Sequence, residues 1–250
     1  MTYACFTVEI ADHIAHIRFN RPDKANSMTP EFWKELPEVV DRISNDAEAR
    51  VIVISSEGKH FTAGMDISVF MSGSLDGDSA NAHVSAEAFR YKIKALQETF
   101  SALERARQPA DAFFAVQETA IGMTADVGTF PRLVKLIPEG WARQMAYTAE
   151  RLPAAKALQI GLVNEVFDSH EDLLDGVMAI ARKIAAHSPL AVAGCKAMAN
   201  YSRDHSTADA LDYISVWNAA MLRPDDIREA YVAKGEKRPP VFDGLKPVSR

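Results

Sequence analysis

The chain has 250 residues, of which 48% are hydrophobic and 25% are charged, a composition typical of soluble globular proteins. The net charge of -6 argues against nucleic acid as the main partner, because phosphate binding needs a basic surface, and the two cysteines, Cys5 and Cys195, lack ligand spacing, which indicates a reducing compartment and no metal site. No apolar run is long enough to cross a membrane, and neither end has a secretory or peroxisomal signal, so we expect a cytoplasmic protein without a membrane partner.

The N-terminal segment carries a strand pattern followed by a helix pattern. Apolar residues alternate over residues 6–10 and again over 15–19, which predicts a β-hairpin. A helix is then predicted to begin at Pro30 with Thr29 as its N-cap, and an apolar stripe continues it. Pro37 lies inside this helix, and we expect it to kink the helix or to delay its start.

The next two elements surround a candidate ligand-binding turn. Residues 51–54 form a continuous apolar run, which predicts a strand buried on both faces, as in a parallel sheet. In residues 61–67, Ala63 and Gly64 let the backbone approach a ligand, and Asp66 could cap a helix that begins there. Free N–H groups at such a helix start can bind a developing negative charge, although an ordinary strand-to-helix turn has the same sequence pattern.

Helix patterns dominate the rest of the chain. Apolar residues spaced by three and four predict a long amphipathic helix over residues 89–103. Helices are also expected over 139–151 and 153–160, the second ended by Gly161, and the last strand over 162–167. Only helices follow, so the pattern predicts an α/β unit with a helical C-terminal segment.

The segment 113–133 holds two carboxylates in apolar surroundings. Glu118 and Asp126 are its two acids, and Gly122 and Gly128 indicate turns between and after them. A carboxylate held among apolar side chains resists ionisation, which suits it to proton transfer near neutral pH. Two such groups could remove a proton at one end of a substrate and return one at the other. The simpler alternative is that both acids cap turns or helix starts.

Five motifs follow one another along the chain. They are Asn20-Arg21-Pro22 with Lys24-Ala25-Asn26, then residues 61–67, 117–122, 154–157 with 161–163, and 236–242. In this order they resemble the crotonase (enoyl-CoA hydratase/isomerase) superfamily over nearly the whole chain. The resemblance implies an α/β fold, with a spiral of ββα units and the acyl-CoA site over residues 1–187 and a helical trimerisation segment over 188–250. It also implies a homotrimer or a hexamer formed as a dimer of trimers.

The resemblance further implies an enzyme that stabilises the enolate of an acyl-CoA thioester without any cofactor beyond the coenzyme A of its substrate. It implies that the backbone N–H of Met65 is one donor of the oxyanion hole. Lys237 is implied as a contact to a CoA phosphate, including one bound by a neighbouring subunit. The substrate-binding residues implied in this way are Lys24, Ala25, Ala63, Gly64, Met65, Asp66 and Ile67.

The pair Glu118 and Asp126 resembles the two acids of dienoyl-CoA isomerases within this superfamily. This implies isomerisation of 3,5-dienoyl-CoA to 2,4-dienoyl-CoA in fatty-acid oxidation, with a proton moved between the ends of the diene. One alternative is an enoyl-CoA hydratase, which would use Glu118 with an acid from elsewhere. The other is a non-catalytic acyl-CoA-binding paralogue. The sequence specifies neither the acyl chain length nor the choice between trimer and hexamer.

The chain departs from the family pattern between Pro109 and Ala110. The Gly-rich turn that carries the second oxyanion donor is absent there, together with its flanking strand and helix, roughly 20 to 30 residues and thus the size of a βαβ crossover. Losing one oxyanion donor costs on the order of 10²–10³ in rate. Either the sequence omits a segment that the protein contains, or the protein carries a true deletion. The well-kept flanking motifs favour the first, and we expect an abnormal Pro109–Ala110 junction.

Overall fold

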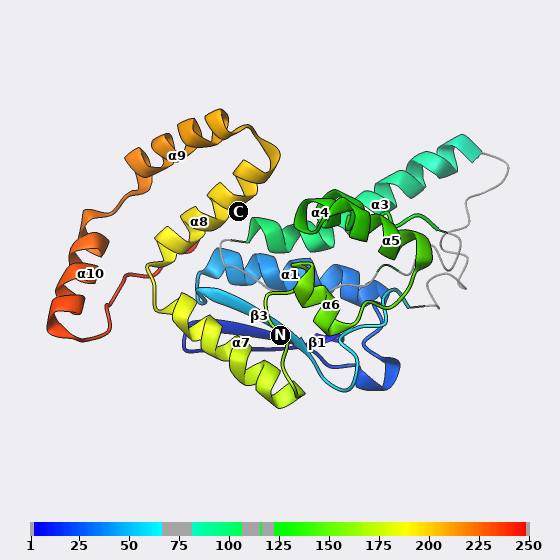
Figure 1. Cartoon of the computed structure of the whole chain (residues 1–250), viewed down its shortest axis with the longest axis horizontal. Coiled ribbons are helices and arrows are strands. Elements are labelled where there is room, and N and C mark those ends of the chain that lie inside the picture. The colour runs from blue at the N-terminus through cyan, green and yellow to red at the C-terminus, as the bar shows by residue number, and fades with distance from the viewer. Residues whose placement is uncertain (1–2, 67–81, 107–115, 117–122, 249–250) are drawn as a thin grey trace.

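The computed structural model describes residues 3–66, 82–106, 116 and 123–248. Its elements are shown in Figure 1. In chain order they are β1 (Phe6–Ala11), β2 (Ile14–Phe19), the 3-10 turn η1 (Pro22–Lys24), α1 (Pro30–Asp46), β3 (Val51–Ser56), α3 (Ala82–Arg105), α4 (Thr129–Leu136), α5 (Glu139–Thr148), α6 (Ala154–Gln159), α7 (His170–Ala185), α8 (Pro189–Asp204), α9 (Thr207–Met221) and α10 (Pro224–Glu236).

The described strands form one sheet of order β1-β2-β3. β1 and β2 pair antiparallel with Phe6 opposite Phe19, and β2 and β3 pair parallel with Ile14 opposite Val51. Asp12 and His13, which join β1 to β2, both have positive φ, as a two-residue type I′ hairpin turn requires. The predicted hairpin and the predicted buried parallel strand are therefore confirmed.

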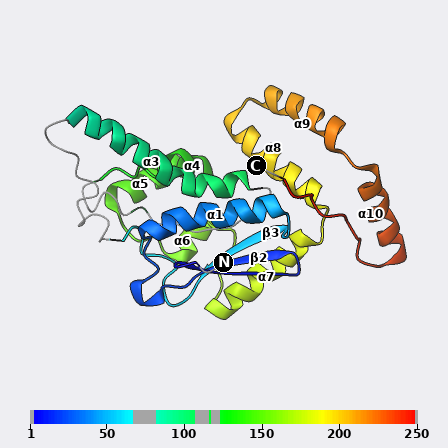
Figure 2. The same cartoon turned by 180° about the vertical axis from the view of Figure 1, so that it is seen from behind.

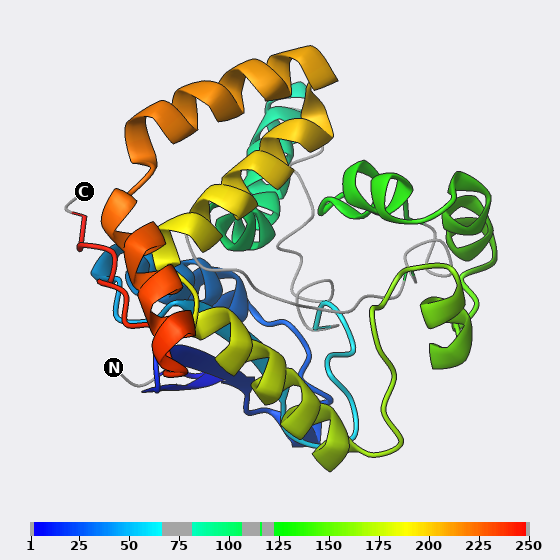
Figure 3. The same ribbon diagram turned by 60° about the vertical axis from the view of Figure 1, so that its left-hand side comes forward.

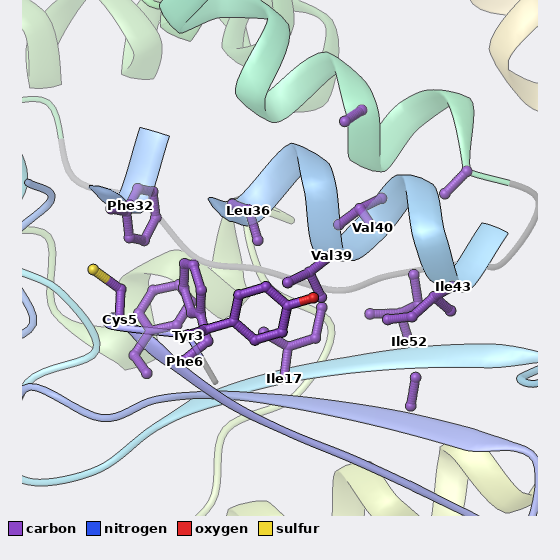
Figure 4. Close-up of a cluster of buried hydrophobic side chains, with 14 of the residues drawn as sticks. Tyr3, Cys5, Phe6, Ile17, Phe32, Leu36, Val39, Val40, Ile43 and Ile52 are labelled. Atoms are coloured by element: carbon purple, nitrogen blue, oxygen red, sulfur yellow. The ribbon is translucent and has the colours of Figure 1, made fainter. Parts of the chain in front are cut away.

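Helix α1 covers one face of this sheet (Figure 4). Its apolar stripe, from Phe32 to Ile43, packs against inward-facing strand residues such as Ile17 and Ile52. The predicted start at Pro30 after Thr29 is confirmed. The helix also continues through Pro37, so the expectation of a delayed start is wrong. Packing of the whole stripe outweighs the one backbone hydrogen bond that a proline removes.

Helix α7 covers the opposite face of the sheet. Val51 and Val53 of β3 point towards it and pack with Ala181 and Ala185, whereas Ile52, between them, points towards α1. This alternation is the period of two expected for a strand with both faces covered. Arg50, just before β3, donates through Nη1 to the carbonyl of Ala185 at 3.0 Å and through Nη2 to that of Phe242 at 2.8 Å, which fastens both α7 and the C-terminal tail.

Helix α3 lies on α1 and extends beyond it (Figure 2). Thr99 and Ala102 of α3 are fully buried. At its C-terminal end, Lys196 of α8 donates to the carbonyls of Leu103 at 2.6 Å and Ala106 at 2.8 Å. The Lys196 ammonium thus supplies a donor to two carbonyls at the end of α3, where a helix leaves its last carbonyls without an intrahelical bond.

Two helical groups extend from this sheet region (Figure 3). Helices α4 and α5 share a second apolar cluster that includes Ala125, Leu133 and Met145, against which Leu152 and Ile160, on either side of α6, also pack. Helices α8, α9 and α10 form an arm on the other side (Figures 1 and 2). Within the described ranges, no helix is both long and apolar enough to cross a membrane. The division into residues 1–187 and 188–250 falls between α7 and α8 and stays a prediction.

After residue 123 the structure departs from the predicted elements in two places, one where an expected strand is missing and one where a helix was not predicted. Residues 162–167 form no strand, although their apolar composition is strand-like, because a strand needs a hydrogen-bonded neighbour and the described residues provide none beside them. Helix α4 was not among the predicted elements: Gly128 was interpreted only as a turn, and it is the N-cap of this helix, whose first turn tolerates Pro131. The helices predicted over 89–103, 139–151 and 153–160 are confirmed, the last two with earlier ends.

Candidate active site

The Met65 segment is held by the loop that precedes α1. Met28 and Met65 form an isolated parallel bridge, in which the N–H of Met28 donates to the Gly64 carbonyl at 2.8 Å and the N–H of Asp66 donates to the Met28 carbonyl at 3.0 Å. In parallel pairing, a residue bonds to the neighbours of its partner, so the peptide groups of the partner itself point the other way. The N–H of Met65 is therefore directed away from Met28, and it has no acceptor among the described residues.

Asn26 joins the two sides of this arrangement. Its side chain is 3% exposed, and its amide donates to the carbonyls of Glu57 and His60 at 2.9 and 2.8 Å, while its Oδ1 accepts from the N–H of Arg21 at 2.9 Å. The hydroxyl of Thr62 donates to the Asn26 carbonyl at 2.7 Å. The loop and the Met65 segment are thus fixed by buried polar contacts, which are costly to leave unmade.

Asp66 contacts the same loop, and its predicted role as a helix cap concerns residues outside the described ones. Its carboxylate accepts from the Ser27 hydroxyl at 2.7 Å and lies 3.8 Å from the Arg21 guanidinium. The segment in which that helix was expected, including Ile67, lies outside the described residues. Asp66 therefore serves to hold the segment that carries Met65.

Lys24 and Ala25 lie at the end of η1, next to the bridge. Ala25 has φ 47, and its carbonyl accepts from the N–H of Ala63 at 2.9 Å, so this residue holds the segment that leads to Met65 through its backbone. Lys24 is exposed. The structure thus brings Lys24, Ala25, Ala63, Gly64 and Met65 together; their contacts to substrate stay predictions.

Asp126 lies in the turn that leads into α4, and its side chain is half-buried. The Gln97 side chain of α3 donates to the Asp126 carbonyl at 2.7 Å. Gly128, with φ 101, is the N-cap of α4. Glu118 lies outside the described residues, so its pairing with Asp126 stays a prediction, as does the abnormal junction at Pro109–Ala110, which also lies outside them.

Lys237 is distant from the η1 loop within one chain. It ends α10 with φ 56 and is exposed. Figures 1 and 2, which view the molecule from opposite sides, both place α10 at the far end from the blue η1 segment. The neighbouring Arg238 pairs with Glu229, and hydrogen bonds from Arg238 and from the Val241 N–H lower the pKa of Glu229 to about 2. A contact from Lys237 to a CoA phosphate therefore requires a neighbouring subunit and stays a prediction.

The sequence interpretation missed three side chains that support these segments. Asn26 lies in one of the five motifs, but a polar residue type does not by itself indicate the four contacts that Asn26 makes. Gln97 and Arg132 carry no motif, and the only available signal was the spacing of Gln97, Ser101 and Glu104 along one face of α3. Among the described residues, no group of three or more His, Cys, Asp or Glu side chains could hold a metal ion.

Comparison with known proteins identifies the family. The sequence matches the family described as Enoyl-CoA hydratase/isomerase over residues 9–99 and 105–245. It is 36% identical to the mitochondrial Delta(3,5)-Delta(2,4)-dienoyl-CoA isomerase of Homo sapiens, covering 90% of this chain and 77% of the relative. It is 35% identical to the peroxisomal Delta(3,5)-Delta(2,4)-dienoyl-CoA isomerase of Arabidopsis thaliana, covering 93% of each.

The solved structures support the same assignment. An enoyl-CoA hydratase of Mycobacterium marinum is 27% identical and has a TM-score of 0.79, covering 96% of this chain and 99% of that one. The alignment with the human relative runs over 253 residues although it uses 90% of this 250-residue chain, so the relative has about 28 residues without a counterpart here. The family match itself is interrupted between residues 99 and 105. The chain belongs to the enoyl-CoA hydratase/isomerase family of enzymes and has its α/β crotonase fold.

Proposed function

We propose that this chain isomerises 3,5-dienoyl-CoA to 2,4-dienoyl-CoA. The observation that carries the proposal is its identity of 36% and 35% to two dienoyl-CoA isomerases over at least 90% of the chain, together with the acids Glu118 and Asp126 in the central segment. An acyl-CoA substrate agrees with the family. A cytoplasmic location stays a prediction, the relatives being mitochondrial and peroxisomal by name.

The reaction needs one proton removed from C2 and one delivered to C6 of the diene. Removal of the C2 proton places negative charge on the thioester oxygen, where the outward-facing N–H of Met65 would donate. Glu118 and Asp126 would share the proton transfers, one at each end of the diene. The double bonds then move from C3 and C5 to C2 and C4, and no atom is gained or lost.

The test is turnover of a 3,5-dienoyl-CoA by the wild-type chain and by Asp126→Asn. We expect the wild type to form the 2,4-diene, and Asp126→Asn to lower kcat by about 10²–10⁴, the usual contribution of a positioned acid or base, with acyl-CoA binding retained. Asp168→Asn, at an exposed position, serves as the matched control and should be unchanged. Undiminished turnover by Asp126→Asn would exclude the proposed role of this acid.

An enoyl-CoA hydratase is the second candidate. The structural likeness to the Mycobacterium marinum enoyl-CoA hydratase favours it. Product analysis separates the two, because a hydratase adds water to a 2-enoyl-CoA and forms a 3-hydroxyacyl-CoA, whereas an isomerase leaves that substrate unchanged.

A non-catalytic acyl-CoA-binding protein is the third candidate, supported by the 28 or so residues that the human relative has in excess. The intact mass of the protein from its native source tests this third candidate. A mass near 27.5 kDa would indicate a true deletion, and binding of CoA esters without turnover would then support this candidate. A mass greater by about 3 kDa, as expected for a further 28 residues at the same mean mass, would indicate that the Gly-rich segment is present.

A further inference from the structure

One face of α3 carries three polar residues that all act on the turn containing Asp126. Gln97, Ser101 and Glu104 are spaced by four and three, so they lie in line on the helix. Gln97 donates directly to the Asp126 carbonyl at 2.7 Å. The other two act through an arginine of α4, as the following contacts show.

Arg132 connects α3 to the end of the same turn. Its guanidinium donates to both carboxylate oxygens of Glu104, at 2.9 and 3.2 Å, and to the Ser101 hydroxyl at 3.3 Å. Its remaining arm donates to the carbonyl of Gly128 at 3.2 Å. Such bidentate arginine–carboxylate pairs fix geometry as well as adding energy. The turn is therefore held at two carbonyls, those of Asp126 and Gly128, on either side of one residue.

Helix α3 is itself held in place by other parts of the chain, so its contacts can fix the position of the turn that contains Asp126. Its opposite face packs on α1 through the fully buried Thr99 and Ala102. Asn200 of α8 donates to the carbonyl of Glu104 at 3.1 Å, next to the Lys196 contacts already described. By contrast, the Asp126 side chain is only half-buried, so its own packing restrains it less than these contacts restrain its backbone.

We propose that the Gln97–Ser101–Glu104 face of α3 is a positioning platform that sets where the Asp126 carboxylate lies. Gln97 and Arg132 bond to backbone carbonyls and not to reacting atoms, so they are positioning residues and Asp126 remains the group that transfers the proton. The proposal rests on the proposed isomerase function. A displacement of about 1 Å in a catalytic group can lower the rate by about 10²-fold, so loss of one contact of the platform should be visible in kcat.

The experiment compares Gln97→Met, which removes the donor from an unbranched side chain, with Gln97→Lys, which keeps one. We expect Gln97→Met to lower kcat by roughly ten- to a hundredfold with KM unchanged, and Gln97→Lys to recover most of the loss. Gln144→Met, at an exposed position on α5, is the matched control and should match the wild type. In an Asp126→Asn background, Gln97→Met should lower the residual kcat no further, because two residues acting as one unit are non-additive.

A second readout does not depend on turnover. Hydrogen exchange of the amides of residues 123–128 should become faster in Gln97→Met and remain unchanged in Gln144→Met. If the wild type turns over the diene but Gln97→Met changes neither kcat nor exchange, the platform is excluded and the isomerase function stands. If the wild type has no turnover and exchange still rises only in Gln97→Met, the turn is held as described but the isomerase function fails, and the proposed positioning role fails with it.

Discussion

The hydroxyl of Thr99 in α3 donates to the carbonyl oxygen of Trp33 in α1, 3.1 Å away. Trp33 lies four residues before Pro37, and in a regular helix its carbonyl would accept from the N–H that proline lacks. Thr99 is fully buried, so its hydroxyl supplies the missing donor from a neighbouring helix. This contact explains how α1 accommodates a proline in its interior.

We therefore predict that Thr99→Val lowers the free energy of unfolding by about 1–3 kcal/mol, because it removes the hydroxyl and leaves the carbonyl of Trp33 without this donor. The loss should shrink in a Pro37→Ala background, where the helix regains its own N–H donor. Urea unfolding of the two single variants and the double variant gives the coupling. Thr148→Val, whose exposed hydroxyl bonds within α5, is the control, and equal losses in both backgrounds would contradict the account.

Asn26→Ala should destabilise the protein by roughly 3 kcal/mol. The substitution removes three hydrogen bonds from a side chain that is 3% exposed and leaves backbone groups on both segments without partners. Asn164→Ala, at an exposed position, should change stability by less than about 0.5 kcal/mol. Thermal or urea unfolding measures both, and a loss no greater than that of the control would show that Asn26 does not join the two segments.

Gly64→Ala should reduce turnover more than it reduces stability. Gly64 has φ +83 and no atom within 4 Å of an added Cβ, so the penalty is backbone strain of about 1 kcal/mol rather than a clash. Relief of that strain would rotate the next peptide group, whose N–H is the one on Met65. Gly140→Ala is the control, since Gly140 also has open space but no positive φ. Equal kcat in Gly64→Ala and wild type would exclude Met65 as an oxyanion donor.

Lys196 should give the stability a pH dependence in the alkaline range. Burial lowers the pKa of its ammonium from 10.5 to about 8, although the negative charge of Glu104 acts to raise that pKa. Between these pH values the unfolded chain holds a proton that the folded chain has lost, so the free energy of unfolding rises with pH across this range. Urea unfolding at pH 7.5 and 10 should show this rise in the wild type and a smaller one in Lys196→Met. Identical slopes would contradict it.

The arm formed by α8, α9 and α10 should mediate assembly into a trimer or hexamer. Large apolar side chains on α9 and α10 are exposed in the single chain, among them Leu211 at 64%, Val216 at 59% and Tyr231 at 75%. So many large apolar side chains exposed on one arm indicate an interface. Light scattering should give three or six chains for the wild type and fewer for Leu211→Glu. Leu136→Glu, 63% exposed on α4, is the control, and a monomeric wild type would exclude the prediction.

Periodicity was enough to predict the elements whose faces are buried in the core. The hairpin, α1 and β3 each show the apolar spacing of their structure, and the structure has them within a few residues of the predicted bounds. Residues 162–167 have the same kind of composition, but strand formation depends on a neighbouring strand, which a local pattern does not reveal. The spacing of apolar residues therefore predicted which faces are buried better than it predicted which strands pair.

The site was only partly predictable, because its supporting contacts join distant parts of the chain. The motif of residues 61–67 indicated a backbone donor, yet the direction of the Met65 N–H follows from the bridge to Met28, 37 positions earlier. The contact between Gln97 and Asp126 spans 29 positions and involves residue types that occur on any helix surface. Sequence pattern thus suggested the reacting groups, while the residues that hold them became visible only in three dimensions.

The double contact of Arg50 bears on the order in which the molecule can complete its fold during synthesis. Arg50, just before β3, leaves the ribosome early, but its partner at Phe242 follows 192 positions later. At about 5–20 residues per second, that partner arrives roughly 10 to 40 s afterwards. During this interval the sheet and α1 can form while the guanidinium still awaits one of its two carbonyls. The C-terminal tail therefore completes the contacts of Arg50 last. A chain interrupted before Phe242 would leave the guanidinium beside the sheet without its second carbonyl partner.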